Sequence, residues 1–193
     1  MKLDALYWQQ RWQEGATGWD IGAASPFLMH VASQFPLNTR ILIPGCGSGY
    51  EAEALWRLGY SGVEVVDIAT EPLRKLAERV PDFPLAQMHH GDLFALEGSF
   101  EVILEQTFFC ALDPQWRRRY AEKMASLLVP KGTLAGLLFD FPLTQEGPPF
   151  GGSREEYQEL FSEYFTLLEM QHTELSIPPR CGRELGFRLE KKS

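Results

Sequence analysis

Short apolar runs alternate with amphipathic segments along most of this sequence, and the alternation indicates strands separated by helices. The apolar runs predict five strands, at residues 41–43, 63–67, 85–89, 100–105 and 133–139. The intervening segments predict helices at residues 51–58, 71–80 and 114–128. Such alternation is typical of an α/β protein with an open, doubly wound sheet. The run Thr133–Phe139 follows a Pro130–Gly132 turn and is apolar throughout, so we expect it in the centre of a parallel sheet.

The two ends of the chain have other patterns. Residues 1–38 are rich in tryptophan and glycine and lack strand periodicity, so we expect a short helix, a loop and a second helix around Pro26–Ser33. Residues 141–152 are rich in proline and glycine and predict a long loop. The remainder predicts a helix at residues 154–164 and two closing strands, 165–173 and 186–190, paired as a hairpin.

The composition is that of a single soluble globular domain. The chain has 193 residues, of which 45% are hydrophobic, and its net charge of −8 disfavours DNA or RNA as a partner. The basic cluster Arg117–Arg119 lies in a predicted helix and is interpreted as a solvated face. The cysteines Cys46, Cys110 and Cys181 suit a reducing compartment and form no metal-ligand pattern. Neither a signal peptide nor an apolar run of about 18 residues is evident, so we expect a cytoplasmic protein without a membrane partner.

A glycine-rich loop follows the first predicted strand and contains Gly45, Gly47 and Gly49. In doubly wound sheets, ligands bind at the carboxyl ends of the strands, where this loop lies. Glycine allows positive φ angles and leaves room for a ligand to approach the backbone closely. The helix after the loop presents free N–H groups and the positive end of its dipole. The alternative is a glycine turn that binds no ligand.

Asp67 ends the second predicted strand, 22 residues after Gly45. A carboxylate in that position can accept two hydrogen bonds from a ribose diol, so the pair predicts an adenosine-type cofactor. The dinucleotide pattern GxGxxG requires a third glycine where Tyr50 stands, whereas the observed GxGxG spacing is associated with S-adenosylmethionine. The alternative for Asp67 is an ordinary surface acid.

A third element follows the third predicted strand, at Gly91-Asp92-Leu93-Phe94. Asp92 can accept a hydrogen bond from the exocyclic amine of adenine, while Leu93 and Phe94 form a wall beside the base. Alone, this pattern is more often a simple turn. After a glycine loop and a ribose-binding acid, we interpret it as the adenine site.

Three tryptophans, Trp8, Trp12 and Trp19, lie within twelve residues near the N-terminus. Trp8 and Trp12 are four residues apart and therefore share one face of a helix. Indole faces attract cations by about 0.5–2 kcal/mol each, and the methyl sulfonium of S-adenosylmethionine is a cation. The three rings could therefore cover the sulfonium, although they could also simply pack the helix on the sheet.

Several longer motifs occur in order along nearly the whole chain. They are the tryptophans with Asp20, IPGCGSGYE at Ile43–Glu51, VVDIA at Val65–Ala69, EQTFFCALDP at Glu105–Pro114, GPPF at Gly147–Phe150 and SIPPR-x-GRE at Ser176–Glu184. With these motifs the sequence resembles the thiopurine S-methyltransferase-like family, and it is most similar to the branch of thiol and halide methyltransferases. The resemblance implies a seven-stranded Class I methyltransferase with an N-terminal cap (1–38) over a Rossmann-like core (39–193).

The resemblance also implies roles for individual residues. The cofactor-binding set would be Trp8, Trp12, Trp19, Gly45, Gly47, Gly49, Asp67, Asp92, Leu93 and Gln106. Gln106 stands where the thiol and halide branch has tyrosine and the thiopurine branch has arginine. A glutamine can still donate a hydrogen bond to the cofactor carboxylate or to the substrate, but it carries no charge.

Methyl transfer from a sulfonium is an in-line displacement, which the enzyme accelerates mainly by alignment and desolvation. A small soft acceptor, such as a thiol, a thiopurine or a halide, needs little base catalysis, so we expect no catalytic side chain. The acceptor-pocket candidates are Phe27, Phe108, Phe139, Asp140 and Phe150. These residues could equally be ordinary core or turn residues.

Three other functions remain open at this stage. The chain could be a non-catalytic protein that binds S-adenosylmethionine and regulates a partner. A nucleotide-dependent oxidoreductase is disfavoured by Tyr50 and by the tryptophans, and a nucleic-acid methyltransferase by the negative charge. We expect a monomer or a weak homo-oligomer that acts on a small molecule.

Overall fold

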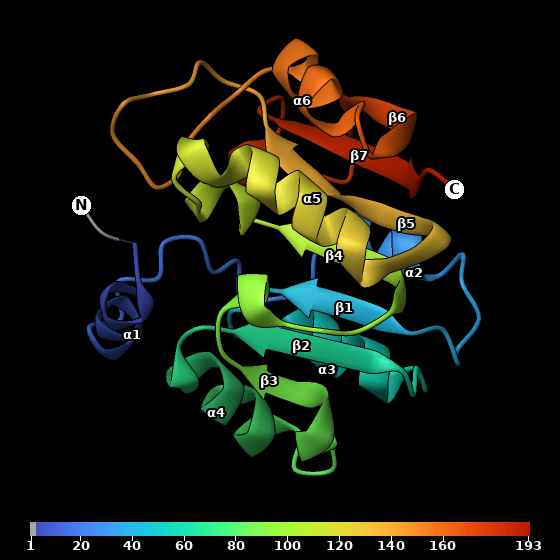
Figure 1. The fold of residues 1–193 in the computed structure, drawn as a ribbon. Coiled ribbons are helices and arrows are strands. Elements are labelled where there is room, and N and C mark those ends of the chain that lie inside the picture. The colour runs from blue at the N-terminus through green and yellow to red at the C-terminus, as the bar shows by residue number, and fades with distance from the viewer. Residues whose placement is uncertain (1–2) are drawn as a thin grey trace.

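The computed structural model describes residues 3–193 and contains one mixed sheet of seven strands (Figure 1). The strands are β1 (Ile41–Pro44), β2 (Val63–Asp67), β3 (Met88–His90), β4 (Phe100–Gln106), β5 (Leu128–Phe139), β6 (Phe165–His172) and β7 (Glu184–Lys191). Their order is β3-β2-β1-β4-β5-β7-β6, and only β7 runs antiparallel to its neighbours. The predicted doubly wound α/β sheet is confirmed, and its order reverses between β1 and β4.

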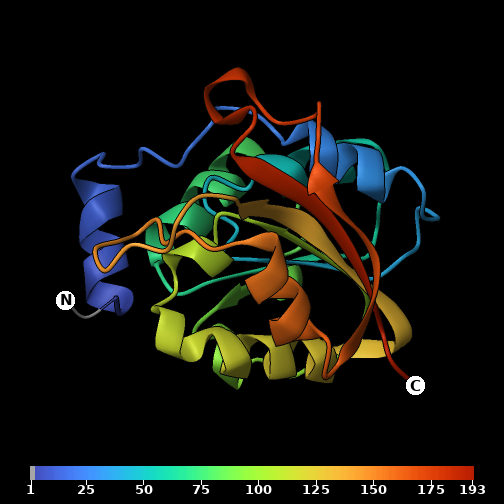
Figure 2. The same ribbon diagram turned by 90° about the horizontal axis from the view of Figure 1, so that it is seen from above.

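Helices cover both faces of the sheet (Figure 2). One face carries α2 (Pro26–Ala32), α3 (Tyr50–Arg57) and α4 (Thr70–Arg79), and the other carries α5 (Arg117–Leu127) and α6 (Arg154–Phe161). The two-residue alternation of the strands divides their side chains between these layers. In β1, for example, Ile41 and Ile43 pack with α2 and α3, whereas Leu42 packs with α5. Among residues 3–193, no helix is long and apolar enough to cross a membrane.

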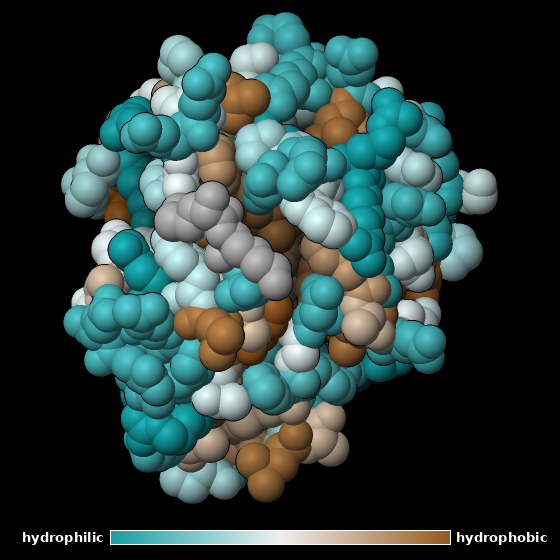
Figure 3. All heavy atoms as spheres, turned by 60° about the vertical axis from the view of Figure 1, so that its left-hand side comes forward, coloured by the Kyte–Doolittle hydropathy of each residue, from teal (hydrophilic) through white to brown (hydrophobic). Residues whose placement is uncertain are grey.

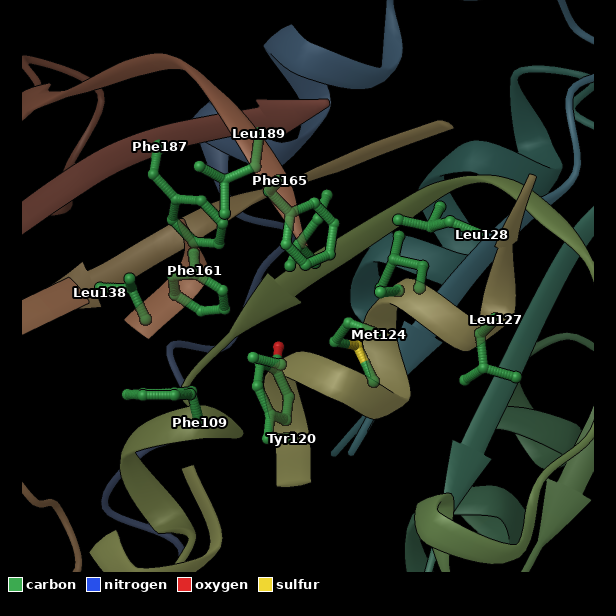
Figure 4. Packing of buried hydrophobic residues seen from close by; sticks show 14 of the residues in the cluster. Phe109, Tyr120, Met124, Leu127, Leu128, Leu138, Phe161, Phe165, Phe187 and Leu189 are labelled. Carbon is green, nitrogen blue, oxygen red and sulfur yellow. The ribbon is translucent and has the colours of Figure 1, made fainter. Parts of the chain in front are cut away.

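Aromatic rings fill the core under α5 and α6 (Figure 4). Phe161 of α6 stacks on Phe187 of β7 with ring centroids 6.2 Å apart. Tyr120 of α5 meets Phe109 edge-on, with centroids 5.1 Å apart. Edge-to-face and stacked pairs of this kind add to the stability that burial alone provides. This core anchors the segment after β4, which contributes to the site described below.

Two predicted boundaries are wrong. Residues Leu85–Gln87, which we expected to begin the third strand, form a single turn of 3₁₀ helix, and β3 is only Met88–His90. The Pro130–Gly132 turn does not precede β5 but lies inside it, because β5 pairs with β4 on both sides of an irregular register. β5 has more residues than β4 between the pairs Phe100–Leu128 and Val102–Thr133, and Lys131, with φ of 65°, is one of these extra residues.

The other elements are close to expectation. The predicted helix 114–128 starts with a 3₁₀ turn at Pro114–Trp116 and becomes α-helical from Arg117. The closing strands β6 and β7 pair antiparallel as predicted. The loop expected at 141–152 is present and is pinned at its ends by a bridge between Phe141 and Gly152.

The N-terminal segment contributes one helix outside the two layers. Helix α1 (Ala5–Gln13) begins at Asp4, whose side chain accepts a hydrogen bond from the Tyr7 N–H. It lies beyond the carboxyl ends of β1 and β2 and packs against α4 (Figure 1). Helix α2, in contrast, belongs to the core, so only α1 and the following loop cover the strand ends. The division of the chain at residue 38 remains a prediction.

Candidate cofactor and acceptor site

Three cavities adjoin Gly45 at the carboxyl end of β1, where the strand order reverses. The large cavity has a volume of about 660 Å³, which lies in the usual range for small-molecule sites. The tryptophan cavity, at about 70 Å³, and the Asp20 cavity, at about 60 Å³, are smaller. Among residues 3–193, Gly45 alone lines all three. Figure 3 looks onto this edge, where hydrophobic side chains lie at the bottom of a hollow in a mostly hydrophilic face.

The glycine loop has the backbone that only glycine adopts readily. Gly45, Gly47 and Gly49 have φ angles of +56°, +52° and +71°, in the left-handed region. The loop is tied to β2, because the Gly45 N–H donates to the Val66 carbonyl oxygen at 2.8 Å. All three glycines line the Asp20 cavity, and Gly45 and Gly47 also line the tryptophan cavity.

Asp67 ends β2 beside this loop and is only 8% exposed. Its carboxylate accepts the Ala69 N–H at 2.9 Å and the Gly47 N–H at 3.3 Å. Burial raises the pKa of Asp67 to about 6, although these N–H donors oppose the shift. At neutral pH the carboxylate is therefore ionised and has acceptor capacity left for a ligand in the large cavity, which it lines.

The far end of the large cavity is lined by Asp92, Leu93 and Phe94. Asp92 accepts the Phe94 N–H at 2.9 Å and caps the 3₁₀ turn Leu93–Ala95. The same residue therefore forms a turn and lines the cavity. Two residues that we did not predict, Trp116 and Arg119, complete this wall. Their spacing of three places them on one helical face, which is the signal that could have identified them.

This end wall is a stack of rings and a cation. Phe94 and Trp116 have centroids 5.7 Å apart, and the Arg119 guanidinium lies 4.5 Å from the first ring and 4.8 Å from the second. All three side chains line the large cavity, where aromatic and guanidinium planes suit a planar base.

The tryptophans enclose the second cavity. Trp19 meets Trp8 and Trp12 edge-on, with centroids 5.4 Å and 5.7 Å apart. Trp12 is 5% exposed, so the rings both pack α1 and line the tryptophan cavity. The cavity is completed by Asp67 and Phe108, among others, and no basic side chain of residues 3–193 lines it.

The Asp20 cavity lies on the other side of Gly45. Asp20, which we did not predict as a site residue although it follows Trp19 in the motif, accepts a hydrogen bond from the Ser48 hydroxyl at 2.5 Å. Glu51 also lines the cavity, together with Gln106, whose Oε1 is buried without a hydrogen-bond partner within residues 3–193. A cavity with two carboxylates and an unpaired amide oxygen suits a ligand that carries an ammonium group.

The acceptor-pocket candidates are less closely grouped. Phe108 lines the large and the tryptophan cavities. Phe27 is buried against Gly186, and Phe150 packs on Gly147. Asp140 pairs with His172, Oδ2 to Nε2, at 2.8 Å.

Phe139 meets Phe141 with centroids 5.2 Å apart. Of the five candidates, Phe27, Phe139, Asp140 and Phe150 line none of the three cavities. Their part in an acceptor pocket remains a prediction.

The SIPPR-x-GRE motif supplies a contact that we did not predict. Arg180, in the loop between β6 and β7, donates from Nη2 to the Trp19 carbonyl oxygen at 2.8 Å. Its Nη1 lies 3.5 Å from the buried Glu184 carboxylate. Arg180 thus joins the C-terminal loop to the segment that carries the tryptophans, across 161 residues of sequence.

Comparison with known proteins agrees with this geometry. The chain is 33% identical over 192 residues to a "probable thiol methyltransferase 2" of Arabidopsis thaliana, covering 96% of this chain and 85% of the relative. It is 29% identical to a thiopurine S-methyltransferase of Gluconobacter oxydans, covering 93% and 91%. The crystal structure of the 1,6-didemethyltoxoflavin-N1-methyltransferase of Burkholderia thailandensis superposes with a TM-score of 0.76, at 19% identity, over 98% and 87% of the two chains.

The family itself is identified by a match over nearly the whole chain. The thiopurine S-methyltransferase family pattern covers residues 3–186. The match confirms the expected enzyme class, an S-methyltransferase that uses S-adenosylmethionine, and decides against an oxidoreductase. This protein belongs to the thiopurine S-methyltransferase family.

Proposed function

We propose that this enzyme methylates the sulfur atom of a small thiol. The observation that carries the proposal is the meeting of three cavities of different chemistry at Gly45. Two of the relatives named above support a sulfur acceptor, since one is a probable thiol methyltransferase and the other a thiopurine S-methyltransferase. Thiocyanate methyltransferases of Brassica oleracea and Arabidopsis thaliana, at 31% and 32% identity, leave a small anion as the second candidate.

The three cavities fit the three parts of S-adenosylmethionine. In the large cavity, Asp67 would accept hydrogen bonds from the ribose hydroxyls, and Asp92 and Leu93 would hold the adenine. Gly45 has no side chain because the Phe108 ring fills that space, where an added Cβ would lie 2.1 Å from it, and the two residues together would border the cofactor. Gln106, which lines the Asp20 cavity, would form hydrogen bonds with the amino-acid part of the cofactor.

The tryptophan cavity suits the reacting centre. The cofactor supplies a methyl group on a sulfonium that is already a good leaving group. The rings of Trp8, Trp12 and Trp19 would stabilise this cation and exclude water, and Asp67 adds a negative charge to the same cavity. Because no basic side chain of the described residues 3–193 lines it, an uncharged thiol is favoured over an anion as the molecule that enters. No side chain is assigned as a base: the thiol proton is released to solvent as the sulfur bonds to the methyl group and the bond from the methyl group to the sulfonium breaks, and the chain contributes alignment.

The acceptor is proposed to be a free small molecule rather than a nucleic acid, in agreement with the net charge of −8. The functional form is proposed to be a monomer or a weak homo-oligomer.

Two measurements test the proposal. S-adenosylhomocysteine is expected to raise the melting temperature, whereas NAD is not. A panel of small thiols, thiopurines, thiocyanate and halides is then assayed for methyl transfer, with thiols expected to react best. Tight cofactor binding without turnover of any acceptor would instead support the non-catalytic, regulatory alternative.

A further inference from the structure

Glu105 lies at the carboxyl end of β4 and is 1% exposed. Its Oε1 accepts two backbone hydrogen bonds, from the N–H groups of Phe108 and Phe109, each at 2.9 Å. A single buried carboxylate oxygen therefore satisfies two consecutive donors of the turn after β4. Without it, both donors would lack a partner in a buried position, which is costly.

The turn that Glu105 holds is strained. Thr107 has a φ angle of 60°, in the left-handed region that non-glycine residues rarely adopt. The turn gives the two following rings different surroundings, although both lie near Tyr120, with centroids 5.1 Å (Phe109) and 6.2 Å (Phe108) from its ring. Phe109 enters the core beside Tyr120 (Figure 4), and Phe108 lies against Gly45 and lines two cavities. Backbone strain of this kind persists only where surrounding contacts enforce it, and the Glu105 carboxylate supplies two of those contacts.

We propose that Glu105 is a positioning residue, whose carboxylate fixes the Thr107 turn and thereby places the Phe108 ring for cofactor binding. The proposal rests on the proposed function, since it assigns a role in holding S-adenosylmethionine. Glu105 itself lines none of the three cavities, so it acts through Phe108 rather than by touching the ligand.

The charge of Glu105 is sensitive to pH near neutrality. Its second oxygen, Oε2, is buried without a hydrogen-bond partner within residues 3–193, and burial raises the pKa of Glu105 to about 7. The facing titratable groups are Glu184 of β7, Cys110 after β4, Tyr120 of α5 and Tyr157 of α6. The ionised carboxylate accepts the two N–H bonds more strongly than the protonated acid, so the turn is held more firmly above pH 7.

The test uses Glu105→Gln and Glu105→Met in the full chain. Gln keeps an oxygen that can accept both N–H groups, whereas Met fills a similar volume without an acceptor. The matched control is Glu101→Gln, an exposed acid on the same strand and away from the cavities. Calorimetric titration with S-adenosylhomocysteine gives Kd for each protein between about pH 5 and pH 8.5.

We expect Glu105→Met to raise Kd by about tenfold, Glu105→Gln to recover most of the affinity, and the control to bind like wild type. In wild type, the affinity falls as pH is lowered through about 7 and again through about 6, where Asp67 titrates. In Glu105→Gln, the fall in affinity near pH 7 should be absent and the fall near pH 6 should remain. If Glu105 had only a structural role, its replacement by glutamine would not abolish the fall in affinity near pH 7 while leaving the fall near pH 6.

The outcomes are separable. If wild type does not bind S-adenosylhomocysteine, the proposed function fails and this proposal fails with it. If wild type binds S-adenosylhomocysteine, and Glu105→Gln binds it equally well and keeps the falls in affinity near pH 7 and pH 6, only the positioning role is overturned. If Glu105→Met does not fold, the pH profile of Glu105→Gln decides the question alone.

Discussion

The ring of Phe108 lies directly over the Cα of Gly45, so closely that a Cβ on residue 45 would be 2.1 Å from the ring carbon Cδ2. The two residues come from the turns after β4 and β1, the neighbouring strands at which the sheet order reverses. This contact excludes every side chain larger than hydrogen at position 45. It also joins the glycine loop to the turn held by Glu105, and so the proposed cofactor site depends on the contact between these two loops.

The first prediction concerns this contact. Gly45→Ala should weaken binding of S-adenosylhomocysteine by at least about tenfold, because the methyl group must displace Phe108 and the φ of +56° is strained for alanine. Calorimetry measures the change. Gly182→Ala is the matched control, since Gly182 has φ of +73° but open space around its Cα. Equal losses in the two variants would show that backbone strain, and not the Phe108 contact, matters.

Asp67 carries the second prediction. Asp67→Ala should weaken cofactor binding by about 1.5 kcal/mol or more, as loss of hydrogen bonds to a charged group does. In wild type the pKa of Asp67 is raised to about 6 by burial, so the carboxylate takes up a proton as pH falls through that value and becomes a poorer acceptor. Affinity should therefore fall below about pH 6 in wild type.

The same titration in Asp67→Ala supplies the control for the pH effect. The fall near pH 6 should be absent from this variant, since the titrating group has been removed. An unchanged affinity at neutral pH would show that the ribose is held elsewhere.

The third prediction distinguishes the two roles of the tryptophans. Trp19→Leu should weaken binding of S-adenosylmethionine more than binding of S-adenosylhomocysteine, by about 0.5–2 kcal/mol, because only the former carries the sulfonium charge. Loss of packing alone would weaken both ligands equally. Trp56→Leu is the control, because Trp56 packs on Phe83 and lines none of the three cavities.

The fourth prediction concerns the link between the chain ends. Arg180→Met keeps the length of the side chain but removes the hydrogen bond to the Trp19 carbonyl. We expect a loss of about 1 kcal/mol in cofactor affinity and faster proteolysis after α1, because the tryptophan loop is then less restrained. Arg183→Met, which removes a guanidinium stacked on Phe141, should change neither. Proteolysis rates that match wild type would contradict the link.

Much of the site could be predicted from the sequence where local geometry decides. The Gly45–Gly49 loop needs positive φ angles, and Asp67 ends an apolar strand, so both are visible as patterns within a few residues. Each lies at the predicted strand end, and both line the cavities. The predicted β3 was too long because an apolar run of mixed composition does not distinguish a strand from a 3₁₀ turn.

Other site residues could not be predicted, because their position depends on surfaces that meet across long sequence separations. Asp20 faces the glycine loop, and Arg180 reaches Trp19, only in the folded chain. Glu105 looks like an acid at the end of an apolar strand, and nothing local indicates that it holds the following turn.

The sequence by itself determined the alternation of strands and helices, the glycine loop, its acidic partner and the family, since periodicity, backbone sterics and motif order are properties of the chain. Tertiary structure alone decided which aromatic rings line the cavities. Phe108 and Phe109 are adjacent in sequence, yet one lines the cavities and the other is buried in the core. The reason is physical: the turn at Thr107, whose following N–H groups donate to the buried Glu105 carboxylate, leaves Phe108 at the edge of the core and Phe109 inside it.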